Sequence, residues 1–287
     1  MQYRSVFRPD LFAGQTVIVT GGGSGLGRCT AHELKSLGAR IALIGRTQQK
    51  LDDVKKELGD DDTFTFAADL RDEAQVKAAV DAVLGWGGRI DGLVNNAGGQ
   101  FPAKLRDISL NGWNAVVNNN MTATFLVSKH VYLGWMEANG GNIVNIGADF
   151  ELGNPGMGHN GAARAGQTNF TYTASVEWAH SGVRVNSVLP GFIASSGLDR
   201  YPEGSHDVLR NVRGRIPMKR HGTESEIAAA IVFLLSDAAA YVTGIALRID
   251  GGLHNNAKSS FYVVPEHDKA KPYNGFPLYK RPKVLGG

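Results

Sequence analysis

The sequence has one cysteine, Cys29, in 287 residues. An intramolecular disulfide is therefore excluded, and the composition points to a reducing compartment. The longest uninterrupted apolar run, Ile227–Leu235, is far shorter than the roughly 20 residues that a membrane-spanning helix needs, so we expect no membrane span. The N-terminal segment carries Arg4 and Arg8 but no apolar stretch after them, so we expect no signal peptide.

The chain also has little net charge. Lysine and arginine number 30 against 27 acidic residues, and the positive excess lies in residues 254–287. The remaining body is nearly neutral, so we expect no nucleic-acid surface. The eight histidines show no spacing with cysteines or carboxylates that suits a metal ion, so we expect no metal site.

Glycine is abundant: it makes up 37 of the 287 residues, a larger share than the usual value of about 7%. This abundance favours many tight turns. Short apolar segments alternate with helical patterns, which is typical of strands buried on both faces of a parallel sheet. The pattern predicts strands at 16–20, 40–44, 63–67, 90–95, 141–146, 183–189 and 245–249. It predicts helices at 24–38, 48–58, 72–84, 112–138, 159–180 and 227–235. The last of these helices follows a capping box formed by Thr223 and Glu226. We therefore predict a single Rossmann-like α/β domain over residues 1–253, with a doubly wound, seven-stranded parallel sheet.

Two segments fall outside this pattern. Residues 192–222 leave the sixth strand at the carboxyl edge of the sheet, where ligands bind, and we predict a substrate lid with a short helix near 207–213. Five basic residues there would suit a coenzyme A phosphate, or simply be solvated. The tail, 254–287, is too aromatic for a free linker, so we expect it to pack along the surface or on a neighbouring subunit. The five tail aromatics are Phe261, Tyr262, Tyr273, Phe276 and Tyr279, and the five lid cations are Arg210, Arg213, Arg215, Lys219 and Arg220.

A glycine-rich loop links the first strand to the first helix. Residues 20–27 fit the pattern T-G-x-x-x-G-x-G, which lets the backbone approach a pyrophosphate at the positive end of a helix. A tight turn without a ligand is the alternative. The predicted cofactor-binding residues of the loop are Gly21, Ser24, Gly25, Leu26 and Gly27.

The end of the second strand indicates which dinucleotide binds. An acidic residue there would bind the ribose hydroxyls of NAD, but this chain has Arg46 between Gly45 and Thr47. A guanidinium favours a 2′-phosphate, and Arg28 is expected to add positive charge nearby. We therefore predict NADP(H) as the cofactor, with Arg46 as a contact.

Several further motifs recur together at a fixed order and spacing. They are Asp69-Leu70, Asn95–Gly98, Trp113 with Asn120, Glu177–Ala179, Val183–Asn186, Pro190-Gly191 and Asp250–Gly252. On these motifs, residues 12–253 resemble the short-chain dehydrogenases/reductases. The resemblance implies that Asp69 and Leu70 flank adenine, that Asn96, Ala97 and Gly98 line the ribose, and that Pro190, Gly191 and Ile193 touch nicotinamide. It also implies a dimer or tetramer formed through the helices at 112–138 and 159–180.

The catalytic segment departs from that family. Where the family has a tyrosine and, four residues later, a lysine, this chain has Asn160 and Arg164, and Gly147 and Ala148 occupy the serine region. Oxidising an alcohol needs a base, whereas reducing a C=C bond conjugated to a thioester needs donors that stabilise an enolate oxygen. We therefore predict Asn160, Arg164, His159 and Asn120 as the catalytic residues, although His159 is equally compatible with a local structural role.

The local strings at 95–101 and 159–166 resemble the peroxisomal trans-2-enoyl-CoA and 2,4-dienoyl-CoA reductases. We predict an NADPH-dependent enoyl-CoA reductase with an acyl-CoA substrate, located in the cytoplasm because Leu285–Gly287 is not a peroxisomal address. The alternative is an alcohol or 3-hydroxyacyl-CoA dehydrogenase, since residues 7–12 resemble bacterial dehydrogenases of citronellol catabolism. A third reading is a catalytically silent nucleotide-binding subunit. Asp149 and Glu151 are either acids at the active face or part of a solvated loop.

Overall fold

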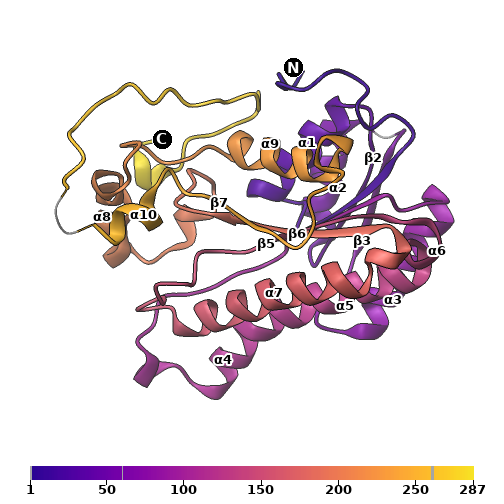
Figure 1. Cartoon of the computed structure of the whole chain (residues 1–287), viewed down its shortest axis with the longest axis horizontal. Coiled ribbons are helices and arrows are strands. Elements are labelled where there is room, and N and C mark those ends of the chain that lie inside the picture. The colour runs from indigo at the N-terminus through magenta and orange to yellow at the C-terminus, as the bar shows by residue number, and fades with distance from the viewer. Residues whose placement is uncertain (1, 60, 260–261) are drawn as a thin grey trace.

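The sheet predicted from the sequence is present. The computed structural model describes residues 2–59, 61–259 and 262–287, and within them seven parallel strands form one sheet of order β3-β2-β1-β4-β5-β6-β7 (Figure 1). The strands are β1 (Thr16–Thr20), β2 (Arg40–Gly45), β3 (Thr63–Ala67), β4 (Gly92–Asn95), β5 (Gly141–Ile146), β6 (Val183–Pro190) and β7 (Ala246–Ile249). The order reverses between β1 and β4, and the crevice at the carboxyl ends of these strands is where such folds bind ligands.

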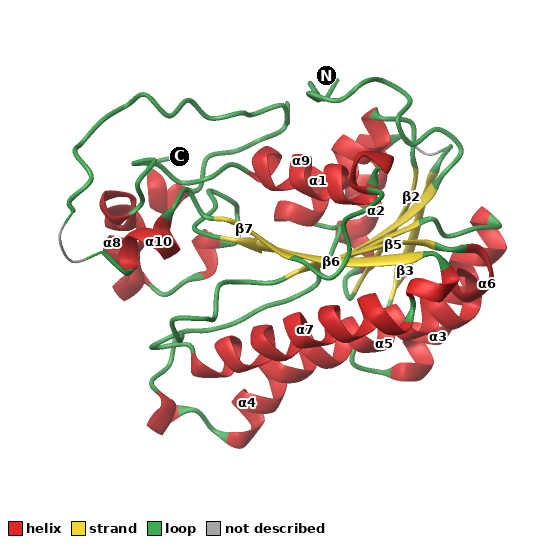
Figure 2. Ribbon diagram, in the orientation of Figure 1, coloured by secondary structure: helices red, strands yellow, loops and turns green. Residues whose placement is uncertain are grey.

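Helices cover both faces of the sheet. Figure 2 shows α1, α2 and α9 on one face and α3, α4, α5 and α7 on the other. The helices are α1 (Gly25–Ser36), α2 (Gln48–Leu58), α3 (Glu73–Gly87), α4 (Leu110–Val117), α5 (Ala123–Val131), α6 (Glu137–Asn139), α7 (Gly158–Glu177), α8 (His206–Asn211), α9 (Glu224–Leu235) and α10 (Leu253–Ala257). Each face has its own apolar core, which is why the strands between them appear as continuous apolar runs.

The helix boundaries correct several predictions. The helix predicted at 112–138 begins at Leu110 and continues to Asn139, but two π-helical turns, Asn118–Thr122 and Tyr132–Met136, interrupt it. The helix predicted at 72–84 runs three residues further, with Asp72 as its N-cap. The helix predicted at 159–180 ends at Glu177. The predicted capping box of α9 is present, although the helix begins at Glu224 rather than at Ile227.

The tail packs along the surface of the same chain. It leaves α10, loops outward and returns over α9 (Figure 1). The Tyr273 carbonyl accepts a hydrogen bond from Thr223 Oγ1, and the Gly275 amide donates to Ser225 Oγ at 3.1 Å. Phe276 is buried against Tyr3 and His32, whereas Phe261 lies outside the described residues.

Candidate active site

The glycine loop leaves open space at the start of α1. Gly21 and Gly25 both have positive φ, at +65° and +55°. A Cβ on Gly21 would lie 2.9 Å from Ala97 Cα, whereas a Cβ on Gly25 would meet nothing closer than 3.9 Å. The Ser24 side chain makes no capping hydrogen bond, so the first-turn amides of α1 lack a side-chain cap. This cradle fits the pyrophosphate of a dinucleotide.

Residues that follow the neighbouring strand β4 hold the glycine loop in position through hydrogen bonds. Thr20 Oγ1 accepts hydrogen bonds from the backbone amides of Asn96 and Ala97, both at 3.0 Å. The Asn96 side chain donates to the Thr20 carbonyl at 3.0 Å, and a Cβ on Gly27 would strike this amide. The predicted ribose-lining residues therefore also fix the position of the glycine loop.

Two predicted cofactor contacts lie at the outer end of the crevice. Arg46 is exposed at the end of β2. Asp69 binds Arg71 through both carboxylate oxygens, and this ion pair lowers the pKa of Asp69 to about 2. Leu70 beside it is buried in the core. Asp69 is therefore an anion throughout the physiological range.

Three of the predicted catalytic side chains converge beneath Gly98 and Gly99. Asn120 lies in the first π-helical turn, fully buried, and its amide donates to the Gly99 carbonyl and accepts from the Gly99 amide, both at 2.9 Å. Asn120 Nδ2 also lies 3.4 Å from Asn160 Oδ1. A Cβ on Gly98 would lie 2.7 Å from Asn120 Oδ1 and 2.8 Å from Arg164 Nη2. Glycine suits position 98 because Asn120 Oδ1 and Arg164 Nη2 occupy the space that a side chain would need.

Arg164 is a buried cation. Its Nη1 donates to the Ile146 carbonyl at 2.6 Å and to Gln167 Oε1 at 3.1 Å, while Nε has no hydrogen-bond partner among the described residues. No carboxylate pairs with it in the part of the chain that the structure describes. Burial lowers the pKa of Arg164 to about 10, so it stays charged at neutral pH. An unpaired buried cation attracts negative charge to its surroundings.

His159 presents one free ring nitrogen. Its Nδ1 accepts a hydrogen bond from the Asn160 amide at 2.9 Å, which puts the proton of the neutral ring on Nε2. Nε2 is buried without a partner among the described residues, and the ring meets Phe101 edge-on at 4.5 Å. An unsatisfied buried donor is costly, and a ligand oxygen would satisfy it.

A buried polar network that the sequence reasoning missed supports these residues. Gln167 accepts from Arg164 and donates to Thr124 Oγ1, which in turn donates to the Asn120 carbonyl. Asn145 on β5 accepts from Asn95 on β4 and donates to Thr171 on α7. The sequence signal that could have revealed this network is the presence of asparagine in otherwise apolar strands.

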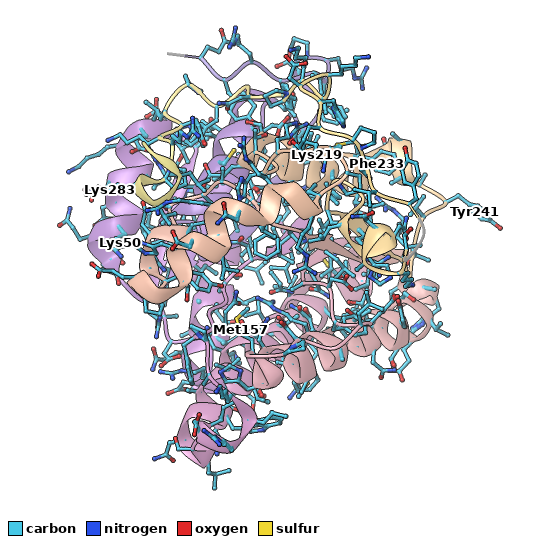
Figure 3. The ribbon with its side chains drawn as sticks, turned by 90° about the vertical axis from the view of Figure 1, so that its left-hand side faces the viewer. Lys50, Met157, Lys219, Phe233, Tyr241 and Lys283 are labelled. Atoms are coloured by element: carbon cyan, nitrogen blue, oxygen red, sulfur yellow. The ribbon has the colours of Figure 1, made fainter. Side chains whose placement is uncertain are left out.

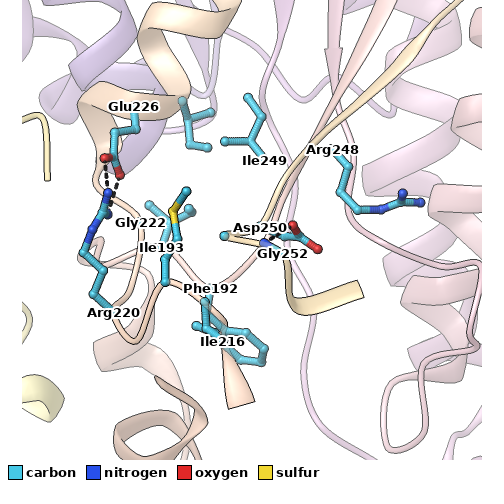
Figure 4. Close-up of a pocket in the computed structure, with 13 residues that line it drawn as sticks. Phe192, Ile193, Ile216, Arg220, Gly222, Glu226, Arg248, Ile249, Asp250 and Gly252 are labelled. Atoms are coloured by element: carbon cyan, nitrogen blue, oxygen red, sulfur yellow. Dashed lines mark hydrogen bonds and ion pairs between the residues drawn. The ribbon is translucent and has the colours of Figure 1, made fainter. Parts of the chain in front are cut away.

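The lid, α9 and the end of β7 line a partly open cavity of about 440 Å³ (Figure 4). The Gly191 amide donates to the Ile249 carbonyl at 2.9 Å, and Ile193 bridges to Gly222, so the segment after β6 contributes Phe192 and Ile193 to one wall. The Arg220–Glu226 ion pair lies at one end of the cavity, and Arg248 extends away at the other. The side chains that line the cavity include Phe192, Ile193, Ile216, Met218, Ile227 and Ile249.

Most of the lid cations already have partners. Arg210 bonds the Val284 carbonyl, Lys219 pairs with Glu266, and Arg220 pairs with Glu226. The predicted basic surface for a coenzyme A phosphate is therefore reduced to Arg213 and Arg215. The short helix expected near 207–213 is α8.

Asp149 and Glu151 form an ion-pair cluster in a loop that is partly exposed to solvent. Asp149 lies 2.6 Å from Nδ1 of the buried His254, and Glu151 lies 2.9 Å from Arg248. The cluster ties the β5–α7 loop to the end of β7 and to α10.

A lid tyrosine reaches the mouth of the site. The Gln100 amide donates to the Tyr201 hydroxyl at 2.8 Å, which joins the lid to the loop after β4.

Within residues 2–59, 61–259 and 262–287, no helix is long and apolar enough to cross a membrane. The same residues contain no group of three or more side chains arranged to hold a metal ion.

Comparisons with known proteins agree with this architecture. The family model described as "Enoyl-(Acyl carrier protein) reductase" matches residues 21–254. A peroxisomal 2,4-dienoyl-CoA reductase of Danio rerio is 37% identical over 257 residues, which cover 88% of this chain and 85% of that protein. A 2-(S)-hydroxypropyl-CoM dehydrogenase of Xanthobacter autotrophicus is 36% identical over 246 residues, covering 83% and 96%.

A solved structure described as a citronellol catabolism dehydrogenase of Pseudomonas aeruginosa PAO1 superposes with a TM-score of 0.79 and 50% identity. The match covers 88% of this chain and 99% of that one. The fold, the glycine loop and these relatives together make the chain a member of the short-chain dehydrogenase/reductase family of oxidoreductases.

Proposed function

We propose that the protein reduces the C=C bond of an enoyl-CoA or dienoyl-CoA thioester with NADPH. The observation that carries this proposal is the buried Arg164 guanidinium, which has no carboxylate partner among the described residues and lies beside the Asn120 and Asn160 amides. Such an arrangement favours a substrate oxygen that becomes negative during the reaction. Relatives named 2,4-dienoyl-CoA reductases support the choice of substrate class.

The chain's own residues suit anion stabilisation better than base catalysis. A bound nicotinamide dinucleotide supplies the hydride. The His159 Nε2 proton, the Asn160 amide and the Arg164 guanidinium are the donors available to the thioester oxygen. Neither Asn160 nor Arg164 accepts a proton readily at neutral pH from an alcohol, because Asn160 does not titrate and the pKa of Arg164 is about 10.

The test is NADPH oxidation, followed at 340 nm, with trans-2-enoyl-CoA and 2,4-dienoyl-CoA substrates of increasing chain length. We expect turnover and a product heavier by two hydrogens. Arg164→Met keeps the side-chain volume but removes the charge, and we expect kcat to fall about 100-fold or more. No turnover with any acyl-CoA, from a protein that binds NADPH, would refute the proposal.

An alcohol dehydrogenase is the second candidate. It is favoured by the 50% identity to the citronellol catabolism dehydrogenase and by Tyr201, whose hydroxyl lies at the site's mouth. NADP⁺ reduction with citronellol that disappears in Tyr201→Phe would establish it. NADP⁺ reduction with a 3-hydroxyacyl-CoA in the same assay would instead identify a 3-hydroxyacyl-CoA dehydrogenase. Tight NADPH binding without turnover on any substrate would instead identify a silent nucleotide-binding subunit.

The preference for NADP(H) over NAD(H) rests on Arg46, exposed at the end of β2. We also propose a cytoplasmic protein, and the single cysteine is consistent with a reducing compartment.

A further inference from the structure

We propose that Glu224 takes up a proton when a dinucleotide binds, so that affinity for the cofactor falls as the pH rises above neutrality. The inference rests on the proposed dinucleotide site.

The geometry places a carboxyl group at the edge of the phosphate cradle. Glu224 is the first residue of α9, which packs beside α1 on one face of the sheet. Its Oε1 lies 3.9 Å from the point where a Cβ on Gly25 would be, and Ser196 Oγ of the lid is equally near. This carboxyl therefore borders the open space into which the first-turn amides of α1 point.

The surroundings of Glu224 leave its charge poorly compensated. The residue is 6% exposed, and its carboxyl group has no hydrogen-bond partner among the described residues. The titratable groups near it are Arg28 and Cys29 from α1 and Tyr279 from the tail; Arg28 lowers the pKa of Glu224, whereas the Glu224 charge raises the pKa of Cys29 and of Tyr279. Arg28 is the one cation among them, and its guanidinium already binds both carboxylate oxygens of Glu57 at 2.7 and 2.8 Å.

Burial without a dedicated partner raises the pKa of Glu224 to about 7, and Arg28 offsets only part of this effect. A pyrophosphate at the start of α1 would bring further negative charge close to this carboxyl group. A like charge disfavours the ionised carboxylate, so the bound complex holds the proton more tightly than the free protein. The proton comes from the solvent.

The direction of the pH dependence follows from linkage. Below about pH 7, Glu224 is already protonated in the free protein, and affinity is independent of pH. Above that value, binding must take up a proton, and affinity falls by up to tenfold per pH unit until the pKa of the complex is reached.

The test measures dissociation constants rather than turnover. Quenching of tryptophan fluorescence gives the Kd for NADPH and for NADH between pH 6 and 9, and calorimetry in buffers of different ionisation enthalpy counts the protons taken up. NADH controls for titration of the 2′-phosphate, whose second pKa is about 6. For the unaltered protein we expect both Kd values to rise about tenfold between pH 7 and 8.5, with close to one proton bound per dinucleotide at pH 8.5.

Two variants assign the effect. Glu224→Gln keeps the shape and should give a Kd that is independent of pH and tighter than wild type at pH 8.5. Glu33→Gln is the matched control, because Glu33 is also buried on α1 with its pKa raised to about 7, yet Tyr3 and Ser5 hold it through hydrogen bonds. This variant should follow the wild-type curve.

The outcomes separate the two proposals. A Kd that does not change with pH, a proton count of zero, or an equally steep curve for Glu224→Gln would overturn the role of Glu224. The proton count needs only the unaltered protein, so it decides the matter even if a variant fails to fold. Absence of dinucleotide binding at every pH would instead overturn the proposed function.

Discussion

At the scale of single residues, Gly98 and Gly99 offer a matched pair. Gly98→Ala should displace Asn120 Oδ1 and Arg164 Nη2, because an added methyl would lie 2.7 and 2.8 Å from them. Gly99→Ala would meet only Asn119 Nδ2 at 3.3 Å. We expect Gly98→Ala to lower kcat about 100-fold and Gly99→Ala to lower it only a few-fold. Equal kinetics for the two folded variants would contradict the placement of the catalytic cluster.

The residues that replace the family's tyrosine and lysine were predictable, because fixed spacing within one helix determines positions 160 and 164. Gln167 was not predictable in the same way. Its role depends on the approach of Thr124 from α5, and no local pattern encodes a contact 43 positions away. The position of Glu224 beside the glycine loop was equally unpredictable, because it depends on how α9 packs against that loop.

At the scale of elements, the tail contributes to the stability of the α1–α9 layer. Phe276 is 4% exposed and contacts Tyr3, His32 and Arg28. Phe276→Ala should cost about 3–5 kcal/mol, which lowers the Tm by roughly 6–15 °C for a chain of this size. Val263→Ala, at an exposed position of the same tail, should leave the Tm unchanged. Differential scanning calorimetry measures both, and an unaltered Tm for Phe276→Ala would show that the tail does not dock in solution.

The sequence predicted the strands well, because a strand buried on both faces needs an unbroken apolar run. It did not predict the π-helical turn at Asn118–Thr122. Such a turn inserts one extra residue into a helix, and it depends on the hydrogen bonds that Asn120 makes to Gly99 on another segment. Similarly, the basic residues of the lid suggested a surface free to bind a coenzyme A phosphate. Three of them instead bind groups of the tail and of α9, which are distant in sequence.

At the scale of the whole molecule, α5 and α7 expose apolar side chains that a monomer would leave in water. Phe125 and Leu133 lie on and just after α5, and Tyr172 and Val176 lie on α7. We expect a dimer or tetramer by light scattering, with these helices at the interface. Leu133→Asp combined with Val176→Asp should shift the mass toward the monomer.

The control for that prediction is Val208→Asp on α8, which is exposed far from these helices and should leave the mass unchanged. A monomeric wild-type protein at all concentrations would contradict the prediction. Another exposed aromatic, Tyr241, projects from the surface (Figure 3) and precedes β7 in the chain. If Tyr241→Ala halves the mass of a tetramer, this region forms its second contact.

The docking of residues 273–276 across the α1–α9 layer has a consequence for how the protein is made. Cys29 lies in α1, yet Phe276, which packs in the same apolar cluster, is synthesised long after that helix. Cys29 in a nascent chain therefore lacks part of its apolar cover until residue 276 has been synthesised. On stalled ribosomes, the Cys29 thiol should react with alkylating reagents, and it should become protected once residue 276 has emerged.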